Sequence, residues 1–191
     1  MTEKEKMLSG ELYNANKDSE LVAERVKAKD LCFDFNNLRP SQKAEKEDIL
    51  KKLLGSVGEN IEIISPFWCD YGYNIVTGKN FFANHNLVIL DCAKVTIGDN
   101  VFIGPDCGIY TATHPLDFQR RKEGLEYALP ITIGNNVWLG GGVKICPGVT
   151  IGEGSVVGAG SIVTKDIPAN VLAVGNPCKV IKGTRKKHLH L

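Results

Sequence analysis

The stretch Ile133–Pro168 divides into six consecutive hexapeptides, "IGNNVW", "LGGGVK", "ICPGVT", "IGEGSV", "VGAGSI" and "VTKDIP". The same phase governs residues 97–114, which read "IGDNVF", "IGPDCG" and "IYTATH". All nine hexapeptides begin with Ile, Leu or Val, and six of the nine have Gly in second place. A six-residue period fits neither an amphipathic helix nor the alternation of hairpin strands. It predicts a β-helix with three flat faces, one hexapeptide on each face and about eighteen residues in a turn.

Each place in the hexapeptide has a physical role in such a coil. The leading aliphatic side chain points into the prism and stacks on its equivalents in the coils above and below. Glycine in second place suits a position without room for Cβ, and the residue in fourth place serves a bend that favours positive φ. The fourth-place residues in question are Asn100, Asn136, Gly142, Gly148 and Gly154.

A weaker form of the repeat runs upstream from Val57 to Cys92. Its phase slips by four residues between Leu87 and Ile97, which predicts one irregular coil there. We therefore expect the β-helix to span residues 57–178.

Residues 1–56 have helical rather than six-residue periodicity. The first predicted helix spans residues 21–35, and its apolar side chains are Leu21, Val22, Val26, Leu31 and Phe35. The second spans residues 41–55, with Ser41 as its N-cap, Gly55 at its end and an apolar stripe of Ile49, Leu50, Leu53 and Leu54. Helices this short are not stable alone, so we expect them to pack on the coil.

Composition excludes several classes of function. The formal net charge is +1, from 23 basic and 22 acidic residues, which gives no bulk attraction for nucleic acid or membranes. No apolar run reaches the length of a membrane span, and "MTEKEKMLSGEL" lacks the apolar core of a signal peptide, so we expect a cytoplasmic protein. The six cysteines are scattered without a C-x-x-C pair, which predicts reduced thiols and disfavours a zinc site.

The coil is interrupted between Ile109 and Ile133, which are four hexapeptides apart. The segment "PLDFQRRKEGLEYALPIT" shows no repeat, so a loop of residues 115–132 leaves the coil, and the coil resumes in phase. His114 is the last residue before this loop. A long loop inside a tight repeat is more often functional than accidental. Trp138 holds the same place in the next regular hexapeptide, so we expect it on an adjoining part of the prism surface.

Several segments together resemble the maltose and galactoside O-acetyltransferase family. They are "TEKEKMLSGELY", "DYGYNI", "NFFANHN", "IYTATHP", "PITIGNNVW", "GAGSIVTKDIP" and "GNPCKVI". The resemblance covers nearly the whole chain, and its N-terminal part is similar to the maltose acetyltransferases of that family. It implies a left-handed parallel β-helix, an exception to the right-handed rule for parallel crossovers. It also implies a homotrimer with active sites between subunits.

The resemblance implies acetyl transfer from acetyl-CoA to a sugar hydroxyl, a 6-hydroxyl above all. His114 matches the family's general base, and histidine suits that task because its ordinary pKa is near 6.5. The hydroxyl would attack the thioester carbonyl directly, and a backbone N–H near Gly141 would stabilise the oxyanion. No metal is implied.

Further positions match the family's binding residues. Those matching the acceptor site are Asn84, Asp70, Asp91, Arg25 and Asn16, where galactoside enzymes have aspartate in place of Asn16. Those matching the CoA site are Gly141, Ala159, Thr164, Lys165, Lys179 and Lys182. The last two stand where galactoside enzymes use arginine, and lysine pairs with phosphate as a point charge rather than a bidentate fork. The rest of the basic segment 179–191 is expected to be a tail.

Three other functions compete with this interpretation. Zinc chemistry of the γ-type carbonic anhydrases needs three histidines, and the coil region has only His85 and His114. A xenobiotic acetyltransferase, acting on an antibiotic hydroxyl, shares the coil, the long loop and the histidine but generally lacks the maltose-type helical segment. A non-catalytic scaffold leaves "THP" and the loop unexplained. His85 is expected to pack or to trim the acceptor site, Trp138 either stacks near the site or covers the prism, and His188 and His190 belong to the chain end.

Overall fold

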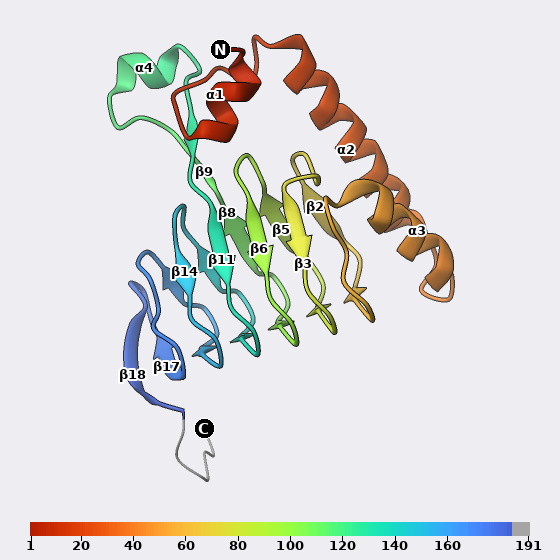
Figure 1. Cartoon of the computed structure of the whole chain (residues 1–191), viewed down its shortest axis with the longest axis vertical. Helices are drawn as coiled ribbons and strands as arrows, with labels where there is room; N and C mark the ends of the chain where they lie inside the picture. The colour runs from red at the N-terminus through yellow and green to blue at the C-terminus, as the bar shows by residue number, and fades with distance from the viewer. Residues whose placement is uncertain (185–191) are drawn as a thin grey trace.

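The computed structural model describes residues 1–184 and shows a left-handed parallel β-helix of about six turns, preceded by helices (Figure 1). The helices are α1 (Glu3–Ser9), α2 (Ser19–Asn37) and α3 (Lys43–Leu53), and a fourth, α4 (Phe118–Lys122), lies in the loop. The predicted fold class is confirmed. We call the three sides of the prism face 1, face 2 and face 3, in the order in which the chain visits them.

Each face is one sheet of short strands that pair in parallel, apart from the last strand of face 1. Face 1 contains β1 (Glu62–Ile63), β4 (Phe82–Ala83), β7 (Phe102–Ile103), β12 (Trp138–Leu139), β15 (Val156–Val157), β17 (Val171–Val174) and β18 (Lys179–Gly183). Face 2 contains β2 (Phe67–Cys69), β5 (Leu87–Leu90), β8 (Gly108–Tyr110), β13 (Lys144–Ile145) and β16 (Ile162–Val163). Face 3 contains β3 (Ile75–Thr77), β6 (Val95–Ile97), β11 (Ile131–Ile133) and β14 (Thr150–Ile151).

The strand register corrects the prediction of one irregular coil. Ile75 pairs with Val95, twenty residues on, whereas Thr132 pairs with Thr150, eighteen residues on. The early coils are therefore regular but two residues longer than the late ones. Both additions fall at the corner between face 2 and face 3, in the turns 70–74 and 91–94, so the four-residue slip is two insertions of two residues at one corner.

The core of the prism is filled from two places in each hexapeptide. The predicted leading residues are buried, as Ile97, Ile133 and Ile151 show. Fifth-place residues such as Val101 and Val137 are equally buried, although the hexapeptide pattern predicted only the leading residues inside the prism. Each fully buried side chain of this size contributes about 1.5–3 kcal/mol of transfer free energy.

The turn chemistry agrees with the prediction. The five fourth-place residues named above all have positive φ, from 54° at Asn100 to 80° at Gly148. In second place the reason for glycine is space, because a Cβ on Gly98 would lie 2.4 Å from Asn135 Oδ1 in the next coil. At the corner between face 3 and face 1, the fourth-place asparagines form a ladder of side-chain hydrogen bonds through Asn60, Asn80, Asn100 and Asn136.

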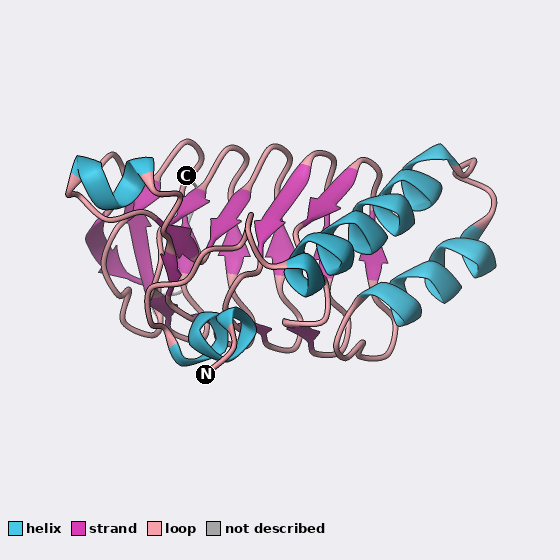
Figure 2. Cartoon of the chain, turned by 90° about the horizontal axis from the view of Figure 1, so that it is seen from above, coloured by secondary structure: helices cyan, strands magenta, loops and turns pink. Residues whose placement is uncertain are grey.

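The helices α2 and α3 lie side by side at one end of the coil, whereas α1 packs against α2 and β10 (Figure 2). The buried stripe of α2 is Leu21, Ala28, Cys32 and Phe35. Val22 and Val26 are 37% and 54% exposed, so the predicted stripe was wrong at these two positions. The Phe35 ring meets Phe67 of β2 edge-on, with 6.4 Å between centroids.

The ends of α3 also differ from the prediction. Gln42, not Ser41, is the N-cap residue, and no side chain caps the helix. Gly55 lies beyond the C-cap residue, Leu54, and its role is close approach, because a Cβ there would lie 2.1 Å from the Tyr73 carbonyl oxygen.

At the other end, part of the expected basic tail is ordered. Residues 179–183 form β18, which pairs antiparallel with β17 and closes the last coil. Lys179 and Lys182 therefore lie on a strand, whereas Arg185, His188 and His190 lie outside the described residues. Within residues 1–184, no helix is both long and apolar enough to cross a membrane.

Candidate active site

Three departures from the six-residue repeat meet at the corner between face 2 and face 3. They are the turns 70–74 and 91–94 and the long loop that follows β8. At this corner a pocket of about 310 Å³ lies between the coil, the loop and the N-terminal segment. Its lining residues are Ala15, Asn16, Arg25, Lys29, Asp70, Leu90, Cys92, Ala112, His114 and Glu126.

The loop has more structure than the sequence suggested. Its base is a short antiparallel pair, β9 (Ala112–Thr113) with β10 (Tyr127–Ala128). The helix α4 between them is capped by Asp117, whose side chain accepts a hydrogen bond from the Arg120 amide. In Figure 1 this helix stands clear of the strands.

His114 follows β9, and its imidazole is held at one nitrogen. Nδ1 lies 2.9 Å from the Leu125 carbonyl oxygen. A carbonyl can only accept, so Nδ1 carries the hydrogen and Nε2 keeps its lone pair. Nε2 lies 4.0 Å from Glu126 Oε2, and both residues line the pocket. A neutral imidazole in this tautomer can accept a proton from a hydroxyl in the pocket.

Arg25 joins the N-terminal segment to the coil at the pocket wall. Its guanidinium donates to Tyr71 Oη at 2.8 Å, to the Ala15 carbonyl at 2.9 Å and to Asn16 Oδ1 at 3.2 Å. The structure therefore places Arg25 and Asn16 together at the pocket wall, as the resemblance predicted for these two residues of the N-terminal segment.

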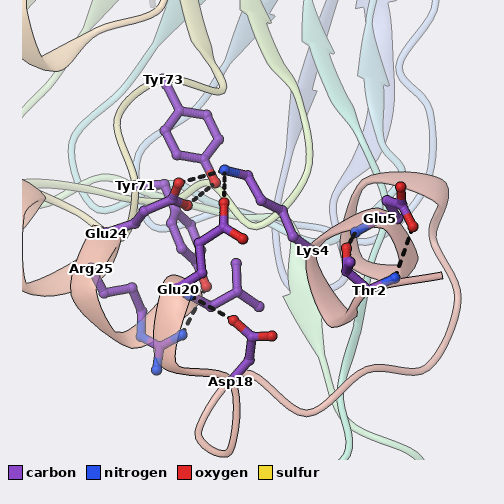
Figure 3. A network of polar contacts seen from close by, with 10 residues as sticks. Thr2, Lys4, Glu5, Asp18, Glu20, Glu24, Arg25, Tyr71 and Tyr73 are labelled. Carbon is purple, nitrogen blue, oxygen red and sulfur yellow. Dashed lines mark hydrogen bonds and ion pairs between the residues drawn. The ribbon is translucent and has the colours of Figure 1, made fainter.

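A second network supports this wall from behind (Figure 3). Lys4 of α1 pairs with Glu20 and Glu24 of α2, and Glu24 accepts a hydrogen bond from the Tyr73 hydroxyl at 2.8 Å. This network links α1 to α2, which carries Arg25, and to the turn 70–74, which carries Asp70.

Asp70 and Asp91 have different environments. Asp70 lines the pocket, and burial raises the pKa of its carboxyl. Asp91 is fully buried behind it, and its Oδ1 accepts hydrogen bonds from the amides of Asp70 and Tyr71 at 3.0 and 2.9 Å. Burial raises the pKa of Asp91 to about 6. Asp91 thus shapes the turn that presents Asp70 rather than lining the pocket.

Sequence reasoning missed five lining residues. They are Ala15, Lys29, Leu90, Ala112 and Glu126. Cys92, noted only as a scattered cysteine, also lines the pocket, with its thiol 3.8 Å from Asp70 Oδ2. The available signal was the slip in the repeat: each insertion marks a turn that leaves the prism at the same corner.

Asn84 lies at a different corner from His114, between face 1 and face 2. Its Oδ1 accepts a hydrogen bond from the His85 amide at 2.8 Å, and His85 Nδ1 lies beside the Ser65 carbonyl oxygen. Within one chain, Asn84 and His114 are on opposite edges of face 2 and do not line the same pocket.

Four of the six candidate CoA residues also flank face 2, whereas Lys179 and Lys182 lie on β18 of face 1. Gly141 and Ala159 lie in successive turns between face 1 and face 2, and there is no room for a Cβ on the adjacent Gly140, since it would be 2.6 Å from the Ala159 nitrogen. Thr164 and Lys165 are exposed on the edge shared with face 3. Trp138 lies on face 1, 45% exposed, between Phe102 and Val156 of the neighbouring coils.

Comparisons with known families match this architecture. The maltose acetyltransferase hexapeptide capping motif matches residues 6–58, the six-repeat bacterial transferase hexapeptide matches residues 130–165, and the hexapeptide repeat of succinyl-transferase matches residues 94–113. A Saccharomyces cerevisiae protein provisionally named an acetyltransferase is 57% identical over 183 residues, which cover 96% of this chain and 93% of that protein.

Two solved structures are similar over the whole fold. A maltose O-acetyltransferase from Clostridium difficile 630 superposes with a TM-score of 0.95 at 56% identity, covering 97% of this chain and 99% of that one. A galactoside acetyltransferase in complex with coenzyme A gives a TM-score of 0.95 at 46% identity, covering 100% and 96%. With its N-terminal capping motif, its hexapeptide coil and these relatives, the chain belongs to the hexapeptide-repeat acetyltransferases of the maltose and galactoside O-acetyltransferase type.

Proposed function

We propose that this acetyltransferase moves the acetyl group of acetyl-CoA to a sugar hydroxyl, the 6-hydroxyl of maltose, glucose or a galactoside. The observation that carries the proposal is the imidazole of His114, fixed by Leu125 with Nε2 free, in a pocket that also contains carboxylates and a guanidinium. Charged side chains of both signs suit a ligand whose hydroxyls both donate and accept hydrogen bonds. The substrates named for the two similar structures support the sugar.

The chemistry requires one base and one oxyanion donor. The sugar hydroxyl gives its proton to His114 Nε2 while its oxygen attacks the thioester carbonyl. When the tetrahedral intermediate collapses, the C–S bond breaks and the imidazolium returns the proton to the CoA sulfur. Within residues 1–184 the Gly141 amide makes no backbone hydrogen bond, whereas Gly142 donates to Pro105, so Gly141 is the donor we assign to the oxyanion.

The acceptor would be held by Asp70, Arg25 and Asn16, with Asp91 acting through Asp70. Asn84 joins this set only if a second subunit brings it there. For CoA we assign the strip along face 2, where Ala159, Thr164 and Lys165 flank Gly141, and the lysines of β18, Lys179 and Lys182, as partners for the phosphates.

We further propose a homotrimer that works in the cytoplasm, where acetyl-CoA is available. The pocket of one chain is open on one side, since the His114 side chain is 51% exposed. The apolar loop residues Leu116 and Phe118 are 98% and 63% exposed next to it. A neighbouring subunit seated there would cover these side chains and complete the site.

Replacing His114 tests the assignment of the base. His114→Ala should lower kcat for acetyl transfer at least about a hundredfold, because the positioned base is lost. His114→Asn is the matched variant, since its side-chain amide can still donate to the Leu125 carbonyl but cannot accept the proton. The measurement is thiol release from acetyl-CoA with maltose, glucose, a β-galactoside, chloramphenicol or no acceptor. A near-normal kcat in either variant would contradict the assignment of His114 as the general base. Thiol release with chloramphenicol as the only active acceptor would favour a xenobiotic acceptor.

A further inference from the structure

The N-terminal segment pairs directly with the loop that orients His114. Tyr13 and Glu126 form an antiparallel bridge in which each amide donates to the other's carbonyl at 3.0 Å. The Tyr13 ring is fully buried at this point. Leu125, whose carbonyl holds His114 Nδ1, is the residue before Glu126. The bridge therefore fixes the backbone on one side of the carbonyl that selects the histidine tautomer.

Asn14 fixes the backbone on the other side. Its Nδ2 donates to the Glu123 carbonyl at 2.8 Å, across a sequence separation of 109 residues. Its Oδ1 accepts from the amides of Asn16 and Lys17, which shapes the turn of its own segment. Asn14 is only 9% exposed, so these bonds lie largely out of water.

Between these two attachments the loop is also held to α4, because the Gly124 amide donates to the Arg121 carbonyl at 3.0 Å and the Leu125 amide to the Arg120 carbonyl at 3.3 Å. Gly124, at φ +81°, lies between Glu123 and Leu125, and glycine is the least restrained residue in this conformation. Residues 116–123 are exposed, so they bury little apolar surface of their own. The bonds to α4 tie the turn only to an exposed helix, so it is the attachments of Glu123 and Glu126 to the N-terminal segment that fix the Leu125 carbonyl relative to the coil.

We propose that Asn14 is a positioning residue for the catalytic base, acting through the Glu123 carbonyl and the turn 123–126 on Leu125 and so on His114. The N-terminal segment then sets the tautomer of the base as well as contributing to the acceptor pocket. This inference rests on the proposed function for its catalytic consequence, but the tautomer itself can be observed without any reaction.

Two variants separate the loop attachment from the local turn. Asn14→Ala removes both functions of the side chain. Asn14→Asp keeps an oxygen for the Asn16 and Lys17 amides but has no hydrogen to donate to Glu123. If the attachment positions the base, both variants should lower kcat by about tenfold or more while the KM for acetyl-CoA stays within about twofold, since small misplacements of a catalytic group are costly.

The spectroscopic readout is the ¹⁵N spectrum of the imidazoles, recorded at about pH 8.5, where a histidine of ordinary pKa is neutral. The chain has four histidines, and the His114→Ala variant assigns the signals of His114. The wild type should show the Nδ1–H tautomer, and both Asn14 variants should show a mixture with the Nε2–H form. His85, beside the Ser65 carbonyl, is an internal reference that should not change.

Asn36 supplies a matched structural control. Its side chain also ties the N-terminal segment to the coil, donating to the Phe67 carbonyl and accepting from the Phe67 amide, but on face 2 away from the loop. Asn36→Ala should destabilise the chain without changing the tautomer of His114 or the kcat. An unchanged tautomer in both Asn14 variants, or the same mixture in Asn36→Ala, would overturn the proposal. A wild type with the Nδ1–H tautomer but no acetyl transfer would overturn the proposed function alone.

Discussion

The environment of the Asp91 side chain is determined by its position at a turn of the coil. Its carboxylate is buried, yet Oδ1 receives two backbone amides, and within the described residues Oδ2 has no hydrogen-bond partner. The sequence resemblance predicted contact with acceptor hydroxyls. Burial could not be deduced from the sequence, because it depends on a two-residue insertion that turns Asp91 inward and leaves Asp70 facing the pocket.

The raised pKa of Asp91 makes a prediction about stability. The folded chain holds this proton more tightly than the unfolded chain, whose aspartate pKa is near 3.8. The stabilisation is complete below that value and is lost as the pH rises through about 6. The unfolding free energy of the wild type minus that of Asp91→Asn should therefore fall between about pH 4 and pH 6, by at most about 3 kcal/mol. Urea unfolding at several pH values measures it, with the exposed Asp34→Asn as control. A difference that rises with pH would contradict the assignment.

At the scale of the elements, the sequence predicted the faces better than the corners. Strand side chains alternate, so residues two apart, such as Ile75 and Thr77, both point inward. An insertion of two residues therefore leaves the apolar pattern intact, and the phase error becomes visible only after two turns. The fourth-place bends were predictable because only Asn, Asp and Gly accept positive φ readily.

The asparagine ladder provides a test of this turn chemistry. Asn100 has φ +54°, accepts a hydrogen bond from Asn80 at 2.9 Å and donates to Asn136 at 3.3 Å. Asn100→Gly should lose only the ladder bonds, at about 1 kcal/mol. Asn100→Ala should lose these and also take on left-handed strain, for a total of about 2–3 kcal/mol. Urea unfolding measures the stability of both variants. We expect the glycine variant to be the more stable, whereas at a position with negative φ the alanine variant would be. Alanine equal to or better than glycine would show that the bend is not held at positive φ in solution.

For the whole molecule, the six-residue period determines a prism, and the prism determines which residues can meet. Arg25 and His114 are 89 positions apart in the sequence, yet both line one pocket because the N-terminal segment packs over the corner at which the loop leaves the coil. Asn84 and His114, which the resemblance placed in one site, lie at different corners of face 2. No pattern within one chain reveals a site shared between copies, because the repeat specifies the coil and not its neighbours.

Mixed assemblies test whether the site is shared. If Asn84 of one subunit meets His114 of the next, Asn84→Ala and His114→Ala should each be inactive alone, yet regain activity when the two chains are unfolded, mixed and refolded together. In randomly mixed closed rings, about a quarter of the interfaces would carry both native residues, so activity should approach a quarter of the wild-type value. Thiol release measures the recovery, and sedimentation should give a mass about three times that of the 20.8 kDa chain. Each variant refolded alone is the control. Mixtures no more active than their components would place both residues in the same subunit's site, and that would require the loop to carry His114 across face 2.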